Sequence, residues 1–337
     1  MGNGKFIISL DFEIYWGVRD AVSLEDYKDN LLGVQKVIPL LLNLFQQYEI
    51  QATFATVGFL FFETKEELLK SVPVRKPEYQ NAKLSPYVGH FNSVGENETV
   101  DSFHFANNLI KQIVEKGQEI GSHSFSHYYC LEKGQTTEEF KEDLIAAKKI
   151  ASKNGIELKS LVFPRNQYNN DYINICQEMG FTSFRGNENS WLFSSENFGN
   201  NVFWRRPFRL LDSYWNLSGH NCYSFEEMKN SWPVNIPSSR FLRPSSKKFN
   251  GLEKLRLRRI EESMSFAAKK GMVYHLWWHP HNFGINMSSN ISFLEKILLH
   301  FKKLNDEWNF QSVSMGQLSK ELSNEKAQIT HFSRQRN

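Results

Sequence analysis

Two histidines four residues apart form the clearest candidate metal site of the sequence. His123 and His127 lie in Gly-Ser-His123-Ser-Phe-Ser-His127, directly after a short predicted strand. Positions i and i+4 share one face of a helical turn, so both imidazoles could point at one metal ion. An isolated HxxxH pair is more often two unrelated histidines. Here the preceding strand and the Gly-Ser favour the metal site, because they place the pair at the C-terminal end of a strand.

Two carboxylates follow the first predicted strand. Asp11 and Glu13 are two residues apart, so on an extended chain they project from the same face. A solvated strand end would also explain them. However, the apolar run Phe6–Leu10 predicts a buried central strand, and carboxylates at its end require a partner such as a metal ion or an arginine.

Two further segments place ionisable side chains just beyond strands. Arg165 follows the predicted strand Ser160–Phe163 and could hold a carboxylate through two hydrogen bonds, although an ordinary surface arginine would look the same. Three histidines, His275, His279 and His281, occupy the last predicted long strand and the residues after it. We expect His275 to be structural and His279, at the strand end, to be catalytic.

These residues are positioned by a regular alternation of strands and helices. The predicted strands are Phe6–Leu10, Gln51–Val57, Glu119–Gly121, Ser160–Phe163, Phe181–Phe184, Met272–Trp278 and Gln311–Ser314. The predicted helices are Asn30–Tyr48, Phe103–Lys116, Thr137–Gly155, with Thr137 as its cap, and Tyr172–Met179. Such alternation predicts a parallel sheet or barrel with helices outside and functional residues at the C-terminal strand ends.

Two stretches interrupt the alternation. Glu63–Asp101 and Asn187–Gly251 are polar or aperiodic, and we expect both to be insertions in one domain spanning residues 1–324. A polar tail, residues 325–337, is expected to follow that domain.

Composition excludes several classes of protein. The 40 Lys+Arg and 37 Asp+Glu nearly cancel, which argues against a surface built for nucleic acid. No apolar run reaches the ~20 residues of a membrane span, and the first residues do not resemble a signal peptide, so we expect a cytoplasmic protein. The cysteines Cys130, Cys176 and Cys222 form neither a metal pattern nor a disulfide framework.

The order of the four segments resembles the NodB-homology polysaccharide deacetylases, carbohydrate esterase family four. That family has the motifs T-F-D-D-G, H-[ST]-x-x-H, R-x-P-Y and L-x-H. The segment His123–His127 is close to the second motif, and Ala52–Gly58 is similar to the A-T-F-F-V-x-G strand before it. The resemblance spans Lys5–Asn282 apart from the two insertions, and it implies a distorted (β/α) barrel.

The first motif differs from the family pattern. Asp11-Phe-Glu13 replaces the adjacent aspartates; Asp11 is similar in position to the catalytic base and Glu13 to the metal-binding aspartate. The segment Asp11–Gly17 also faintly resembles deformylases that act on lipid-linked sugars. The third motif keeps Arg165 and Tyr168 but lacks the prolines. The family's fourth motif, a D-W pair that precedes the late L-x-H, has a weak match in Glu188-Asn-Ser-Trp191.

The resemblance implies a site that binds Zn²⁺ or another divalent ion through Glu13, His123 and His127. Asp11, held ionised by Arg165, would take a proton from water. His279 would protonate the leaving amine.

Substrate contacts follow from the same resemblance. The backbone N–H of Tyr168 would stabilise an oxyanion, and His281 would contact the substrate or pack at the rim. Trp191, Trp277 and Trp278 could form a wall for a sugar ring, with core packing an equal alternative for Trp277.

The expected activity is metal-dependent removal of an N-acyl group, most simply acetyl, from an amino sugar of a polysaccharide or its lipid-linked precursor. An amide hydrolase with a non-sugar substrate and a carbohydrate-binding protein with a vestigial site remain alternatives. The run Arg240–Arg259 has eight basic residues and one acid, which predicts a solvated face or, less often, contact with a membrane surface.

Overall fold

A curled parallel sheet is the frame of the protein. The computed structural model describes residues 3–190, 192 and 202–334. Within these residues the strands are β1 (Lys5–Phe12), β2 (Ala52–Thr56), β3 (Glu119–Ser122), β4 (Ser160–Leu161), β5 (Ser183–Phe184), β6 (Val234–Asn235), β7 (Arg240–Phe241), β8 (Val273–Trp278) and β9 (Gln311–Ser312). Their order is β6-β5-β4-β3-β2-β1-β8-β7, with β9 also paired to the start of β1.

The sheet must curl because its two ends are adjacent in sequence. Only residues 236–239 join β6 to β7, and five residue steps reach at most ~18 Å, whereas eight flat strands would span roughly 34 Å. The curl also brings His275 of β8 within 3.2 Å of the Ile236 carbonyl, which accepts from its Nδ1. The expected distorted (β/α) barrel is therefore confirmed. However, Asn187–Gly251 is not simply an insertion, because it contributes β6 and β7.

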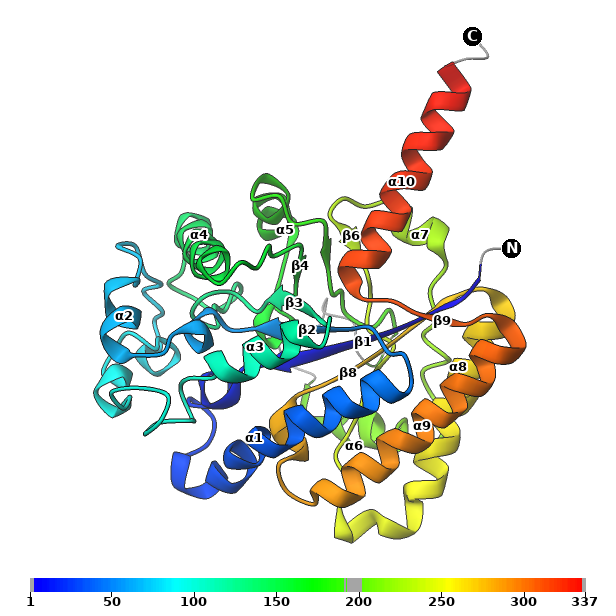
Figure 1. Ribbon diagram of the computed structural model, residues 1–337, viewed down its shortest axis with the longest axis horizontal. Helices are drawn as coiled ribbons and strands as arrows, with labels where there is room; N and C mark the ends of the chain where they lie inside the picture. Colours follow the sequence, from blue (N-terminus) through cyan, green and yellow to red (C-terminus); the bar gives the residue numbers. More distant parts are fainter. Residues whose placement is uncertain (1–2, 191, 193–201, 335–337) are drawn as a thin grey trace.

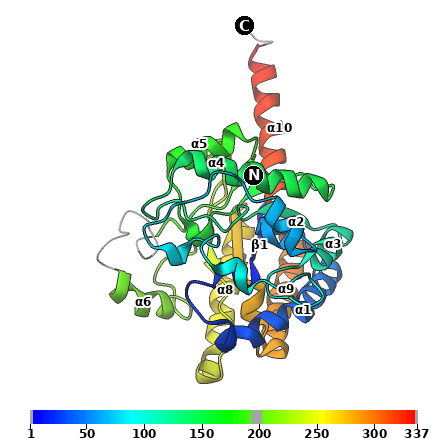
Figure 2. The ribbon, with the colours of Figure 1, turned by 90° about the vertical axis from the view of Figure 1, so that its left-hand side faces the viewer.

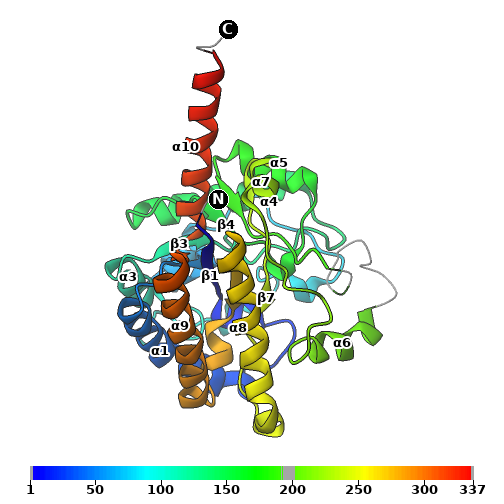
Figure 3. The same cartoon turned by 90° about the vertical axis from the view of Figure 1, so that its right-hand side faces the viewer.

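Helices surround the sheet (Figures 1 and 2). They are α1 (Leu24–Gln47), α2 (Lys65–Lys70), α3 (Asn107–Glu115), α4 (Thr137–Lys153), α5 (Asn170–Glu178), α6 (Val202–Leu211), α7 (Phe225–Lys229), α8 (Glu253–Lys270), α9 (Met287–Trp308) and α10 (Met315–Arg334). The helix α10 projects from the body and includes residues 325–334 of the expected polar tail (Figure 3). No helix in the described ranges is long and apolar enough to cross a membrane.

The predicted helices form, but their ends differ from the sequence pattern. The helix α1 begins at Leu24, where the Ser23 hydroxyl accepts from the Asp26 N–H. The cap of α4 is Thr136, not Thr137, and Glu139 completes a reciprocal capping box with it. Cap chemistry thus sets both boundaries more sharply than apolar periodicity does.

Alternation along the strands separates the barrel interior from the helical layer. Phe6, Ile8 and Leu10 pack with the helices in the main core. Ile7 points the opposite way, into a second apolar cluster that Met315 and Leu318 of α10 help to close. Polar side chains then follow on the same inward face of β1, first Ser9 and then Asp11, toward the C-terminal strand ends. The barrel therefore has an apolar base and a polar mouth.

Candidate metal centre and its surroundings

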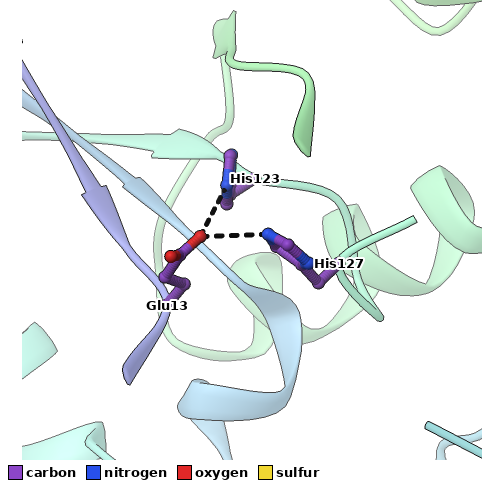
Figure 4. A group of neighbouring side chains, drawn as sticks. All are labelled: Glu13, His123 and His127. Carbon is purple, nitrogen blue, oxygen red and sulfur yellow. Dashed lines mark hydrogen bonds and ion pairs between the residues drawn. The ribbon is translucent and has the colours of Figure 1, made fainter. Parts of the chain in front are cut away.

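Glu13, His123 and His127 converge at the barrel mouth (Figure 4). The Oε2 atom of Glu13 is 3.1 Å from Nε2 of His123 and 3.0 Å from Nε2 of His127. All three side chains are buried, and one ligand atom from each lies within 4.8 Å of the others. Two imidazoles and a carboxylate are a donor set typical of catalytic zinc sites, which leave further coordination positions open. The predicted metal group is thus brought together.

The segment that presents the two histidines is a loop, not a helical turn as the sequence spacing suggested. Ser124 and His127 both have a φ of 59°, in the left-handed region. Buried Asp143 of α4 holds this loop, because its carboxylate accepts from the backbone N–H groups of Phe125 at 2.6 Å and Ser126 at 3.1 Å, and from the Ser126 hydroxyl. Burial raises the pKa of Asp143 to about 6.

The hydrogen bonds at Nδ1 of His123 and His127 indicate whether Glu13, His123 and His127 can bind a cation. His123 donates from Nδ1 to the Val162 carbonyl at 2.8 Å. His127 shares Nδ1 with the Tyr129 hydroxyl at 3.2 Å. Burial lowers the pKa of His127 to about 4, so its ring is neutral near pH 7. With Nδ1 protonated, both Nε2 lone pairs face a carboxylate oxygen, an arrangement that a cation would stabilise.

Asp11 is held by Arg185 and not by Arg165, which corrects the pairing expected from sequence. Arg185 donates from Nη1 and Nη2 to the two Asp11 oxygens at 2.6 and 2.7 Å, and both side chains are buried. It also donates to the Ser9 hydroxyl and to the Asn166 amide oxygen, each at 3.1 Å. Burial raises the pKa of Asp11, but Arg185, with His123 and His279, outweighs this and lowers it overall.

Arg165 instead lies over a neighbouring part of the mouth. Its guanidinium pairs with Asp20 and, at 3.4 Å, with Glu132, and it stacks 4.1 Å from the Tyr129 ring centre. Its φ of 53° is left-handed, so the chain turns its side chain away from Asp11. The neighbouring Asn166, also left-handed at 52°, is the residue of this loop that reaches Arg185.

His279 faces both carboxylates. Its Nε2 is 3.5 Å from Oε1 of Glu13 and 3.7 Å from Oδ2 of Asp11, and its side chain is 23% exposed. His281 is buried beneath it, with the two rings stacked 5.0 Å apart. Burial, reinforced by His279, lowers the pKa of His281 to about 3. Of these two rings, the exposed one is placed to meet a substrate. His275 is buried in the sheet, as expected of a structural histidine.

Of the two adjacent tryptophans expected at the sugar wall, Trp277 faces the barrel interior and Trp278 faces the helical layer. Trp278 pairs in register with outward Leu10, is fully buried, and stacks on Phe283 in the main core. Trp277 pairs with inward Ser9, and its ring lies 4.1 Å beneath the Arg185 guanidinium. Trp191 lies outside the described residues.

Tyr168 is half-buried. Its hydroxyl accepts from the Asn187 N–H at 3.0 Å, and its ring contacts those of Phe163 and Phe184. Its role toward an oxyanion stays a prediction.

Three basic residues of the run Arg240–Arg259 are buried, namely Arg240, Arg256 and Arg259, so these three cannot contribute to a membrane-facing basic surface. Buried Arg240 donates to Asp212 at 3.0 Å, and buried Arg256 pairs with Glu253. Glu188 lies in the field of Arg240 and Asp212, and burial raises its pKa to about 8. Among the described carboxylates, Asp11 and Glu13 are the ones that pair with His279, so Glu188 does not replace the fourth-motif acid there.

Sequence reasoning missed two residues of the site, Arg185 and Asp143. A signal existed for Arg185, since it lies two positions after inward Ser183 at the end of a predicted strand. Asp143 gave none, because an acid in an amphipathic helix looks like a surface residue until the neighbouring loop is known.

Comparison with known proteins supports this fold. Residues 26–184 match the family model for polysaccharide deacetylase. The structure resembles a protein proposed to be a polysaccharide deacetylase from Mycobacterium smegmatis, with a TM-score of 0.60, 12% identity, and coverage of 97% of this chain and 92% of that one. It also resembles the structure of a protein described as a probable polysaccharide deacetylase from Pseudomonas aeruginosa PAO1, with a TM-score of 0.52, 11% identity, and coverage of 94% of this chain and 89% of that one. No curated protein gives a significant match. Residues 26–184 thus match the polysaccharide deacetylase family, and the fold of the described residues is similar to that of the two solved structures.

Proposed function

We propose that this protein is a metal-dependent N-deacetylase that removes an acetyl group from an amino sugar of a polysaccharide or of its lipid-linked precursor. The observation that carries the proposal is the buried convergence of Glu13, His123 and His127 beside Asp11 and His279. We infer that the resident ion is Zn²⁺, because two imidazole nitrogens and one carboxylate suit it. When bound, such an ion supplies Lewis acidity toward water and the amide carbonyl.

The chain's own residues divide the proton transfers. Arg185 keeps Asp11 ionised, so Asp11 can accept the proton of an attacking water as a general base. His279, partly exposed and facing both carboxylates, donates a proton to the leaving amine nitrogen. The C–N bond breaks as the water oxygen bonds to the acyl carbon, giving acetate and a free amine. Trp277, inward and half-buried, offers a ring face next to Arg185 for a sugar ring.

Paired substitutions on the first strand test the division of labour. Asp11→Asn should keep Zn²⁺ and abolish turnover, because it removes a base and not a ligand. Glu13→Gln should weaken Zn²⁺ binding and lose turnover with it. The measurements are Zn²⁺ content of the purified chain and acetate release from an N-acetylglucosamine oligomer.

The outcomes also separate the alternatives. Stoichiometric Zn²⁺ with hydrolysis of small acyl amides and no action on N-acetylated sugars would favour a non-sugar substrate. Binding of the oligomer without Zn²⁺ and without turnover would favour a vestigial site. If Asp11→Asn loses the ion and Glu13→Gln keeps it, the two roles are exchanged.

A further inference from the structure

We propose that Tyr129, Asp20 and Arg165 form a tether that orients His127 toward the metal ion; this inference rests on the proposed function. The tether begins at the imidazole, where Nδ1 of His127 lies 3.2 Å from the Tyr129 hydroxyl. That hydroxyl donates to Oδ1 of Asp20 at 3.2 Å. The single hydroxyl proton of Tyr129 is donated to Asp20, so the hydroxyl oxygen can only accept a hydrogen bond from His127. Nδ1 of His127 is therefore the protonated nitrogen, and Nε2 keeps its lone pair for the metal ion.

Arg165 completes the tether on its far side. The Asp20 side chain is only 4% exposed, and a buried carboxylate needs a cationic partner, which Arg165 supplies at Oδ2. The same guanidinium lies over the Tyr129 ring, and the Tyr129 and His127 rings meet at an interplanar angle of 84°, with 5.1 Å between their centres. Tyr129 is therefore held in place twice, through its hydroxyl by Asp20 and through its ring by Arg165.

The two metal-site imidazoles are oriented by different means. The partner of His123 is the backbone carbonyl of Val162, which no side-chain change removes. The partner of His127 is a chain of side chains from the segments after β1, β3 and β4. Only the second orientation can be altered by substitution, which makes the tether testable.

The test is Zn²⁺ affinity of the full chain, measured by competition with a chromogenic chelator. Tyr129→Phe keeps the ring and removes the hydroxyl, and it should weaken affinity roughly 10- to 100-fold. The matched control is Tyr128→Phe, which removes a neighbouring buried hydroxyl that bonds Gln135 and the Thr136 carbonyl instead; its affinity should stay that of the wild type.

Substitutions at Asp20 provide a second arm. Asp20→Asn keeps an acceptor for the tyrosine hydroxyl and should lose less affinity than Asp20→Ala. Combining Asp20→Ala with Tyr129→Phe should add little to the loss from Tyr129→Phe alone, since both act through one arm. The absorption spectrum of the Co²⁺-loaded chain should change in Tyr129→Phe and not in the Tyr128 control.

Equal Zn²⁺ affinity and Co²⁺ spectra in wild type and Tyr129→Phe would overturn the tether while leaving the deacetylase proposal intact. A wild type that binds Zn²⁺ tightly, loses affinity in Tyr129→Phe and hydrolyses no N-acetylated sugar would support the tether and overturn the deacetylase proposal. A wild type with no Zn²⁺ affinity would overturn both.

Discussion

Removal of the Arg185 guanidinium should separate the stability of the barrel mouth from its chemistry. Arg185→Met keeps much of the side-chain volume but leaves Asp11, which is 3% exposed, without its cation. Four hydrogen bonds are lost, two of them to Asp11 at 2.6 and 2.7 Å. Breaking a buried ion pair from one side costs about 3–5 kcal/mol, so we expect a loss of that size in the free energy of unfolding of the metal-free chain, measured with urea.

The pH dependence of this loss has a definite sign. In the folded wild type the pKa of Asp11 lies below its unfolded value, so the pair stabilises the fold above the unfolded pKa and is lost as pH falls through the folded one. The deficit of Arg185→Met should therefore be larger at pH 7 than at about pH 3. Because burial then raises the pKa of Asp11 with less opposition, the acid limb of kcat/KM on an N-acetylglucosamine oligomer should move to higher pH.

A second buried arginine provides the control for Arg185. Arg240→Met breaks the pair with Asp212 in a separate cluster. It should lower stability comparably while leaving the acid limb where it is. A loss below about 1 kcal/mol in Arg185→Met, or an acid limb that moves equally in both variants, would refute the assignment of Arg185 as the partner of Asp11.

Four further substitutions, one of them with its own control, probe other parts of the mouth. Gly17→Ala would place a Cβ against the carboxylate of Glu13, so it should weaken Zn²⁺ binding at least tenfold, measured by chelator competition. The control Gly251→Ala, where the added Cβ meets open space, should leave Zn²⁺ binding unchanged. His279→Ala should lower kcat by a factor on the order of 10² to 10⁴, while His281→Ala, which vacates a buried position, should lower the urea midpoint more than kcat; the reverse pattern would make His281 the acid. Asp143→Ala leaves two buried N–H groups without their acceptor and should cost about 3 kcal/mol or more in unfolding free energy, an expectation that a loss under 1 kcal/mol would contradict.

The sequence predicted the architecture because strand–helix alternation is a local signal. The same local signal identified His123, His127 and the pair Asp11 and Glu13, since each group follows an apolar strand whose C-terminal end had to lie at one edge. The resemblance to the deacetylases then selected Glu13 as the metal ligand. The choice between Trp277 and Trp278 follows from alternation only once the register of β1 and β8 is known, because Trp277 then pairs with inward Ser9.

What the sequence could not supply is contact between segments far apart along the chain. Arg165 and Arg185 both follow short strands, and each could have reached Asp11 on pattern alone. The choice depends on the left-handed turn at Arg165 and on the curl that carries β5 across from β1, and neither is encoded in residue spacing. The two short strands β6 and β7 lack the length for a periodic signal, so their segment looked like an insertion.

The short link between β6 and β7 has a consequence for protein engineering. Residues 236–239 connect β6 and β7, the two edge strands of the sheet order. The length of this linker therefore limits the circumference of the barrel. Each residue added there would let the seam open by up to ~3.3 Å, whereas residues added to a helix-bearing connection elsewhere would only lengthen a loop. Lengthening residues 236–239 should therefore widen the barrel interior. It would draw the Ile236 carbonyl away from His275 before it disturbed the metal-binding side chains on the opposite wall.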